Sequence, residues 1–320
     1  MNVIYFLVQQ TMTFSIPLLI VALGGMFSER SGVVNIALEG IMVIGAFMGI
    51  LFIYIIQSNS IGLSGQILLI TALVIAAAAG GLISLSHAYA SINMKADQVI
   101  SGTAINLFAT AFAIYVARSI RTVQQIPFNN EFRVQRVPGL GSIPILGPLL
   151  FQNVYITTYI GFFILALSAL VLYKTRFGLR LRSCGEHPQA ADSVGINVYR
   201  MRYAGVFISG ILAGIGGLVF VVPSSTEFNA TVAGYGFLAL AVLIFGQWKP
   251  ARILFAAFFF GLLKAMAASY SGISFMQNIP IPSNIYKMMP YIVTLIVLAF
   301  TSKKSQAPRA EGIPYDQGNR

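Results

Sequence analysis

The sequence has little charge: only 9% of its 320 residues are Asp, Glu, Lys or Arg, whereas 57% are apolar. An average soluble domain carries roughly 25% charged residues, so this composition excludes a water-soluble protein and requires lipid around much of the surface. The single cysteine, Cys184, excludes a disulfide within the chain and a cysteine-based metal cluster. Two histidines, His87 and His187, leave too few side chains for a metal site or a catalytic triad. We therefore expect an integral membrane protein with no metal and no catalytic residues.

Apolar runs long enough to cross the hydrocarbon core as helices, about 20 residues each, recur along the chain. Nine spans are predicted, at roughly 5–27, 34–56, 66–92, 98–118, 154–173, 203–222, 235–245, 252–269 and 286–300. The seventh is short and bounded by glycines, which favours a broken or re-entrant element. The expected fold class is an all-α integral membrane protein: a polytopic bundle of about nine transmembrane helices. It forms one domain over residues 1–302, followed by a tail at 303–320.

The basic residues behind the net charge of +11 are distributed unevenly between the two sides of the membrane. Nine spans place the termini on opposite sides of the membrane, and cytoplasmic loops are enriched in Lys and Arg. With the C-terminus inside, 14 of the 20 basic residues fall on the cytoplasmic side and five outside, while Lys264 lies within a span. The distribution predicts an outer N-terminus and a cytoplasmic C-terminus. It also makes nucleic-acid binding a poor explanation of the charge.

Two loops are longer than connectors need to be. The inner loop, 174–202, contains Pro188, an Ala pair and Gly195, which predict a short helix lying across the inner surface. That helix could dock in a groove of another protein or simply cap the bundle. The outer loop, 119–153, is rich in Pro and Gly and is predicted to be shaped but not helical. Its Arg133 and Arg136 could pair with acidic residues of an extracellular partner or be ordinary solvated charges.

Polar residues also occur at membrane depth. Residues 28–40 interrupt the apolar pattern, and Glu39 lies about 9 Å beyond Val33 at helical rise, too deep to face lipid. Such a segment either marks a translocation path or holds helices together. Lys264 is near mid-span, where Glu39 or Glu227 could pair with it. Asn106 could be a ligand or an interhelical hydrogen bonder.

Several motifs carry a family resemblance. GEHPQAADSVGINVYRMR at 185–202, followed by SGILAGIGG, resembles the coupling loop of ATP-binding-cassette (ABC) importer permeases of the branched-chain amino acid and ribose type. SERSGVVNIALEGIMVIGAF at 28–47 and KADQVISGTAINL at 95–107 resemble the subgroup that works with nucleoside-binding lipoproteins of the basic-membrane-protein type, and the PGLGSIPILGP loop at 138–148 extends the resemblance. The resemblance extends to about Ser302, and the chain resembles the shorter member of a permease pair.

The resemblance implies a multi-pass permease domain in a bacterial cytoplasmic membrane, paired with a second permease as a heterodimer. Two ATPase subunits would lie below it and a substrate-binding lipoprotein above. No GxxxxGK[ST] phosphate loop occurs, so ATP and Mg would be bound by the partner ATPase, and this chain would be no enzyme and hold no cofactor. The residues implied in coupling to the ATPase are Glu186, Pro188, Gln189, Ala190, Ala191, Gly195 and Ile196.

The expected cargo is a nucleoside such as guanosine or uridine. Its base and ribose suit aromatic stacking and Asn or Glu hydrogen bonds. Residues predicted along the substrate pathway are Asn35, Glu39, Asn106 and Phe108. The alternatives are the same family carrying a simple sugar or branched-chain amino acid, and a self-sufficient secondary transporter with Glu39 and Lys264 as an ion or proton relay. A membrane enzyme is disfavoured by the lack of a catalytic cluster.

Overall fold

The computed structural model describes residues 3–59, 62–63, 65–144, 147–269, 282–301 and 306–318. The long helices are α1 (Val3–Arg30), α2 (Leu38–Ser58), α3 (Gly65–Ala88), α4 (Gln98–Arg121), α5 (Ile156–Lys174), α8 (Val198–Ser224), α10 (Pro250–Ser269) and α12 (Ser283–Thr301). The shorter helices are α6 (Arg176–Glu186), α7 (Pro188–Ser193) and α9 (Tyr235–Phe245), and a π-helical turn, η1 (Tyr89–Asn93), extends α3. The prediction of an all-α membrane bundle is confirmed.

Each of the nine predicted apolar runs contains a helix, but the helices are not nine equal spans. Seven described helices are long and apolar enough to cross a membrane: α1, α2, α3 with η1, α4, α5, α8 and α10. The 11 residues of α9 rise only about 16 Å, roughly half of the hydrocarbon thickness. As its flanking glycines suggested, α9 is a half-length element within the bundle.

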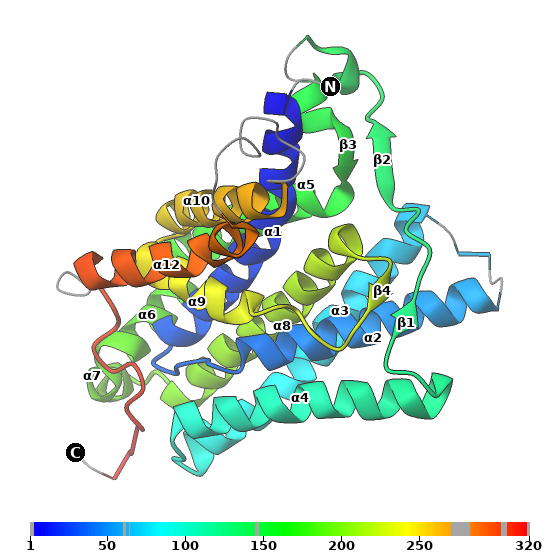
Figure 1. The fold of residues 1–320 in the computed structure, drawn as a ribbon. Helices are drawn as coiled ribbons and strands as arrows, with labels where there is room; N and C mark the ends of the chain where they lie inside the picture. Colours follow the sequence, from blue (N-terminus) through cyan, green and yellow to red (C-terminus); the bar gives the residue numbers. More distant parts are fainter. Residues whose placement is uncertain are drawn as a thin grey trace.

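Helix α8 runs through the centre of the bundle and packs against α1, α2 and α3 (Figure 1). Glycine allows this packing. A Cβ on Gly214 of α8 would overlap the carbonyl oxygen of Ala76 on α3, and a Cβ on Gly45 of α2 would overlap the backbone of Gly214. Close backbone approach of this kind is a usual way for helices to associate in membranes, where apolar side chains gain little by leaving lipid.

The bundle has two distinct ends. One, here called the β2 end, is formed by residues 122–144 and 147–155 together with 227–228. It contains two short antiparallel pairs, β1 (Ile126–Pro127) with β4 (Glu227–Phe228) and β2 (Arg133–Arg136) with β3 (Gln152–Tyr155). The other, called the α7 end, is formed by α6, α7 and residues 306–318. The chain begins near the β2 end and finishes at the α7 end (Figure 1).

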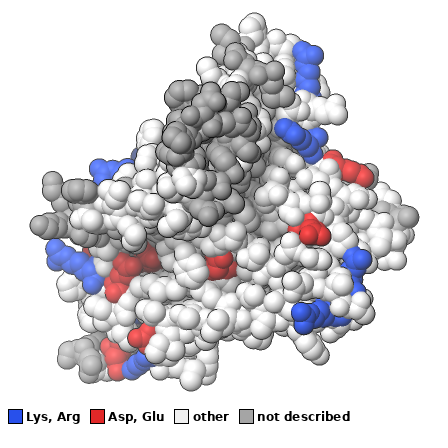
Figure 2. All heavy atoms as spheres, viewed as in Figure 1, with Lys and Arg blue, Asp and Glu red and all other residues white. Residues whose placement is uncertain are grey.

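The loop predicted at 119–153 therefore starts inside the last turn of α4 and finishes within β3. Its described part has no α-helix beyond that last turn, but it does contain a 3-10 turn (Leu140–Ser142) and a π-helical turn (Gly147–Phe151). On the face shown in Figure 2, most of the described surface carries neither acidic nor basic side chains, as expected for a protein surrounded by lipid.

Candidate translocation and coupling sites

The break between α1 and α2 is the first polar feature inside the bundle. Its backbone cannot rely on water, so neighbouring side chains satisfy its peptide groups. The Val34 N–H donates to Gln98 Oε1 (2.7 Å), and the Val34 carbonyl oxygen lies 2.9 Å from His87 Nε2. Ser28 Oγ donates to the Val33 carbonyl oxygen (2.7 Å). The segment is thus held by α1, α3 and α4 together.

Asn106 and Asn35, two of the predicted pathway residues, also belong to this break. Asn106 Oδ1 accepts from the Gly40 N–H (2.7 Å), and its Nδ2 donates to the Ile36 carbonyl oxygen (3.0 Å). Asn35 is fully buried, and its Nδ2 donates to Ser209 Oγ on α8 (2.8 Å). Asn35 Oδ1 has no hydrogen-bond partner among the described residues. In this single chain, both amides act as connections between helices.

Glu39 lies in the first turn of α2 and faces the start of α9. Its Oε1 accepts from the Gly234 N–H (2.9 Å), and its Oε2 accepts from the Gly236 N–H (2.6 Å). Helix N-termini carry unpaired N–H groups and a positive dipole end, so one carboxylate stabilises the starts of two helices. Phe108 is separate from this group, because its ring is 52% exposed on α4 and stacks on Phe112.

Lys264 does not pair with either carboxylate considered from the sequence. Its Nζ lies 4.8 Å from the ring centroid of Tyr291 and 5.4 Å from that of Tyr235, and it donates to Tyr291 Oη (3.2 Å). Glu39 instead caps α9, and Glu227 accepts from Asn229 Nδ2 (3.4 Å). Lys264 also lines a pocket of about 260 Å³ together with Phe14, Phe220, Ala233, Tyr235, Ala267 and Ala268.

The short helix predicted in the inner loop is present as α7. Pro188 occupies its first turn, and Gly195 follows it with a φ of +83°, a conformation that favours glycine. Pro188 and Ala191 are buried against the bundle, whereas Val194 is 76% exposed. The other coupling residues implied by the resemblance are exposed (Glu186, Gln189, Ala190, Gly195) or half-buried (Ile196).

Helix α6, which precedes α7, was not anticipated. Thr175 Oγ1 caps it by accepting from the Gly178 N–H (3.1 Å). Leu181 and Cys184, three residues apart, are fully buried, while Arg180 is exposed. This spacing is typical of an amphipathic helix and could have been recognised in the sequence. Arg30 links α6 to α1 by an ion pair with Glu186 (3.4 Å).

Residues 306–318, here called the strap, fold back across the α7 end. The Ala310 N–H donates to the Gly185 carbonyl oxygen of α6 (2.8 Å), and the Gly312 N–H donates to the Gly32 carbonyl oxygen in the α1–α2 break (3.2 Å). Tyr315 is 4% exposed and belongs to a buried cluster that includes Cys184. The strap therefore connects α6 to the α1–α2 break. No local pattern in the sequence predicts this connection.

Further strap contacts are polar. Arg202 Nη1 of α8 donates to the Ile313 carbonyl oxygen (3.0 Å), and Lys95 forms an ion pair with Asp316 (2.6 Å). Glu311 is hydrogen-bonded to the buried Glu29 carboxyl, and burial raises the pKa of Glu311 to about 7. Burial also raises the pKa of the Cys184 thiol to about 11. The strap thus contributes Glu311 and Tyr315 to a region in which a carboxyl and a thiol are both buried.

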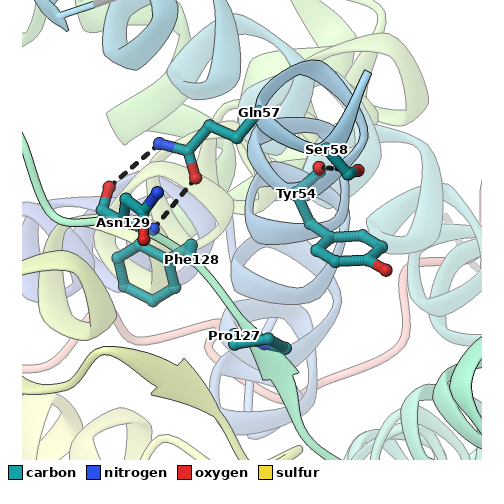
Figure 3. A pocket seen from close by; sticks show the side chains of 6 residues that line it. All are labelled: Tyr54, Gln57, Ser58, Pro127, Phe128 and Asn129. Carbon is teal, nitrogen blue, oxygen red and sulfur yellow. Dashed lines mark hydrogen bonds between the residues drawn. The ribbon is translucent and has the colours of Figure 1, made fainter. Parts of the chain in front are cut away.

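At the β2 end, the long loop is fastened to α2 by Gln57. Gln57 Nε2 donates to the Asn129 carbonyl oxygen (3.0 Å), and Gln57 Oε1 accepts from the Asn129 N–H (2.9 Å), as Figure 3 shows. The pocket beside it, of about 190 Å³, is lined by Tyr54, Gln57, Ser58, Pro127, Phe128 and Asn129 (Figure 3).

Arg133 and Arg136 are exposed on β2 of the same loop. Arg133 Nε donates to the Asn153 carbonyl oxygen (3.2 Å), and Arg136 Nη2 donates to Ser142 Oγ (2.7 Å). Each guanidinium has five N–H donors, so donors remain for other partners.

Within the described part of the chain, no group of three or more His, Cys, Asp and Glu residues could hold a metal ion.

This combination of a half-length helix, a buried polar break and an outward surface helix agrees with a comparison against protein families. Residues 7–298 match the family described as the branched-chain amino acid transport system permease component. The chain belongs to this permease family.

The permease is similar over its whole length to named relatives. It is 43% identical to the guanosine ABC transporter permease protein NupQ of Bacillus subtilis, covering 100% of this chain and 99% of that protein. It is 39% identical to the nucleoside ABC transporter permease protein NupC of Lactococcus lactis, covering 98% of each. The nucleoside ABC transporter permease protein NupB of Lactococcus lactis is 23% identical, covering 95% of this chain and 82% of that protein. No solved structure matches the permease.

Sequence reasoning about the permease did not predict the neighbours of Lys264. Lys264 was recognised, but Tyr235 and Tyr291 reach it from other helices, 29 and 27 residues away along the chain. Their only sequence signal is that both are tyrosines within apolar runs. The pathway set likewise divides, because Asn35, Glu39 and Asn106 meet at the α1–α2 break while Phe108 lies on the exposed face of α4.

Proposed function

We propose that this permease is one of two transmembrane subunits of an ABC importer for nucleosides, and that it forms half of the translocation pathway. A substrate-binding lipoprotein delivers the cargo, and a separate ATPase subunit, which binds ATP and Mg, drives the transport. The observation that carries the proposal is the full-length similarity to permeases named for guanosine and nucleoside transport. The chain itself is a transport subunit and not an enzyme.

In this proposal α7 is the contact with the ATPase. Gln189 and Ala190 of this helix are exposed, and Val194, which follows its last residue, is 76% exposed. A small, partly apolar helical surface suits docking into a groove of another protein. Pro188, Ala191 and Ile196 support this surface from behind, and Glu186 is held by its ion pair with Arg30.

The same proposal assigns the two ends of the bundle. The α7 end lies in the cytoplasm of a bacterial cell, and the β2 end faces outward, so the N-terminus is outside and the C-terminus inside. The excess of Lys and Arg on the α7 side supports this orientation. Arg133 and Arg136 are then available to acidic side chains of the binding lipoprotein. Domain 1–302 is the permease, with 303–320 as the cytoplasmic tail.

The second permease subunit is proposed to cover α4. This helix is the most exposed of the seven candidate spans, and its outward side chains include Leu107, Phe108 and Tyr115. Lipid or a homologous subunit could solvate such a face. The existence of two nucleoside permeases in Lactococcus lactis, both similar to this chain, favours a heterodimer. Asn35, Glu39 and Asn106 would then hold the shape of the pathway from inside one subunit, while Phe108 would approach it from the interface.

The test is uptake of labelled guanosine, adenosine and uridine by vesicles that contain the assembled complex. Uptake is expected only when both ATP and the ATPase subunit are present. Transport by this chain alone, driven by a gradient, would support a secondary transporter instead. Uptake of ribose or of a branched-chain amino acid without any nucleoside uptake would overturn the proposed cargo.

The coupling role of α7 has its own test. Replacing Val194 by Asp should abolish ATP-driven uptake while the complex still assembles, because a charge enters an apolar contact with the ATPase. Met94→Asp is the matched control, since Met94 is 66% exposed next to Lys95, which contacts the strap. Equal loss of uptake in both variants, or unchanged uptake in Val194→Asp, would refute the assignment of α7.

A further inference from the structure

The pocket beside Lys264 contains a buried polar group that nothing in the described structure satisfies. Tyr235 is only 2% exposed, and its hydroxyl has no hydrogen-bond partner within the described residues. A buried hydroxyl without a partner costs free energy, so such groups usually have a role. The pocket reaches the surface at Ala268, which is exposed. A molecule entering there would meet both the hydroxyl and the ammonium of Lys264.

The walls of the pocket are aromatic. The rings of Phe220 and Tyr235 lie 4.0 Å apart between centroids, at an angle of 35°, and Phe14 contributes a further ring. Flat aromatic ligands stack on such surfaces. The volume of about 260 Å³ is slightly below the roughly 300 Å³ at which pockets for drug-sized ligands begin. It therefore suits one heterocyclic ring system better than a larger molecule.

The polar groups of the pocket determine which base it favours. Lys264 can only donate hydrogen bonds, because an ammonium has three donors and no acceptor. Guanine presents acceptors at O6 and N7, and uracil-type bases present one at O4. Adenine shares the N7 acceptor but carries an amino donor at position 6, and cytosine carries an amino donor at position 4. An ammonium aimed at that edge favours the keto bases. The Tyr235 hydroxyl can both donate and accept, so it can complete the contact.

We propose that this pocket receives the base of a nucleoside during translocation and selects keto bases over amino bases through Lys264. The proposal rests on the function proposed above and adds Lys264 as a specificity-determining residue. The pocket adjoins Glu39, because Tyr235 lies between Gly234 and Gly236, whose N–H groups donate to Glu39. Stacking against Phe220 and Tyr235 holds the base in place. Lys264 then discriminates among bases by the acceptor on the base edge.

The experiment measures the ratio of guanosine uptake to adenosine uptake by the complete complex. The binding lipoprotein is the same in every assay, so a change in this ratio between variants arises in the permease. Lys264→Met should lower the ratio about tenfold, within the range that one hydrogen-bonded base edge provides. Lys264→Arg, which keeps donors and charge, should retain most of the preference, and Tyr235→Phe should reduce guanosine uptake.

Arg121→Met is the matched control, because Arg121 also lies over a tyrosine, 5.2 Å from the ring centroid of Tyr54, but far from this pocket in the chain. It should leave the ratio unchanged. Equal losses of guanosine and adenosine uptake in Lys264→Met would show a structural role and overturn the proposal. An unchanged ratio would overturn it as well.

A second measurement decides the question if Lys264→Met does not assemble. Ala268→Cys places a thiol at the exposed edge of the pocket, and the native Cys184 is fully buried, so background labelling is low. Guanosine, but not adenosine, should slow maleimide labelling at this position. Absence of protection would refute the pocket. By contrast, a wild-type complex that imports no nucleoside at all would refute the proposed function itself.

Discussion

The rate at which Cys184 is labelled should measure how often the strap is open. Cys184 is fully buried in the cluster that contains Tyr315, and it is the one cysteine in the sequence. Because Tyr315 packs in this cluster, we expect the thiol to react with maleimide when the strap opens. Its pKa, raised to about 11 by burial, further reduces the reactive thiolate while the strap is closed. Wild-type labelling in intact membranes should therefore be slow.

Tyr315→Ala removes the largest side chain that the strap contributes to this cluster. Tyr315 is 4% exposed and packs near Cys184, Ala191 and Val198, with the Arg202 guanidinium 6.0 Å from its ring centroid. Deleting a buried aromatic ring costs about 3 kcal/mol or more. Since about 1.4 kcal/mol changes an equilibrium tenfold, the open form should become roughly 100 times more populated. The rate of Cys184 labelling should rise by the same factor.

Two controls separate packing from other effects. Tyr315→Phe keeps the ring and should label nearly as slowly as the wild type. Asp316→Asn removes a solvent-exposed ion pair with Lys95 and should change the rate only slightly, because exposed pairs contribute little to stability. If Tyr315→Ala and a chain ending at Arg309 both label at the wild-type rate, the strap does not cover Cys184 and the reasoning is refuted.

Three further predictions concern the strap, the polar break and the helix packing. Docking of the strap raises the pKa of Glu311 from 4.5 to about 7, so docking weakens as pH rises through this range. The rate of Cys184 labelling in the wild type, divided by the rate in Glu311→Gln, should therefore increase about tenfold between pH 6 and pH 8. A constant ratio would contradict this reasoning. Glu39→Gln leaves one N–H at the start of α9 facing an amide donor, so the free energy of unfolding of the purified complex should fall by about 1–3 kcal/mol. An unchanged free energy of unfolding would show that the cap is dispensable. Gly214→Ala places a methyl group against the Ala76 carbonyl oxygen and should reduce the yield of assembled complex, with a cost of about 1–3 kcal/mol, whereas Gly62→Ala, with open space around it, should not.

The helices were predictable from the sequence because bilayer thickness fixes the length of an apolar run. Local signals also fixed α7, where Pro188 starts the helix and Gly195, at positive φ, ends it. The family followed from the motifs around these residues, and the comparison confirmed it. What local patterns specify well is therefore secondary structure and membership of a family.

The contacts of polar side chains could not be predicted in the same way. Glu39 was recognised as too deep for lipid, but its partners are backbone N–H groups of Gly234 and Gly236, which no residue type in the sequence identifies. Two carboxylates were considered as partners of Lys264, but its ammonium lies beside two tyrosine rings instead. In a bundle, the neighbour of a side chain depends on helix rotation and on glycine contacts such as Gly45 with Gly214, which one sequence does not determine.

The strap joins α6 to the α1–α2 break over a very short distance. Its hydrogen bonds to Gly185 and Gly32 start from residues 310 and 312, which even a fully extended chain separates by only about 7 Å. If an ATPase displaces α6 and α7, that displacement reaches the interior break through a connection of two residues. A chain that ended at Arg309 would keep the described helices α1 to α12 and still lose both hydrogen bonds of this connection. Loss of residues 310 and 312 should therefore be as harmful as a disruptive substitution in the helix core, although neither residue lies in a membrane helix.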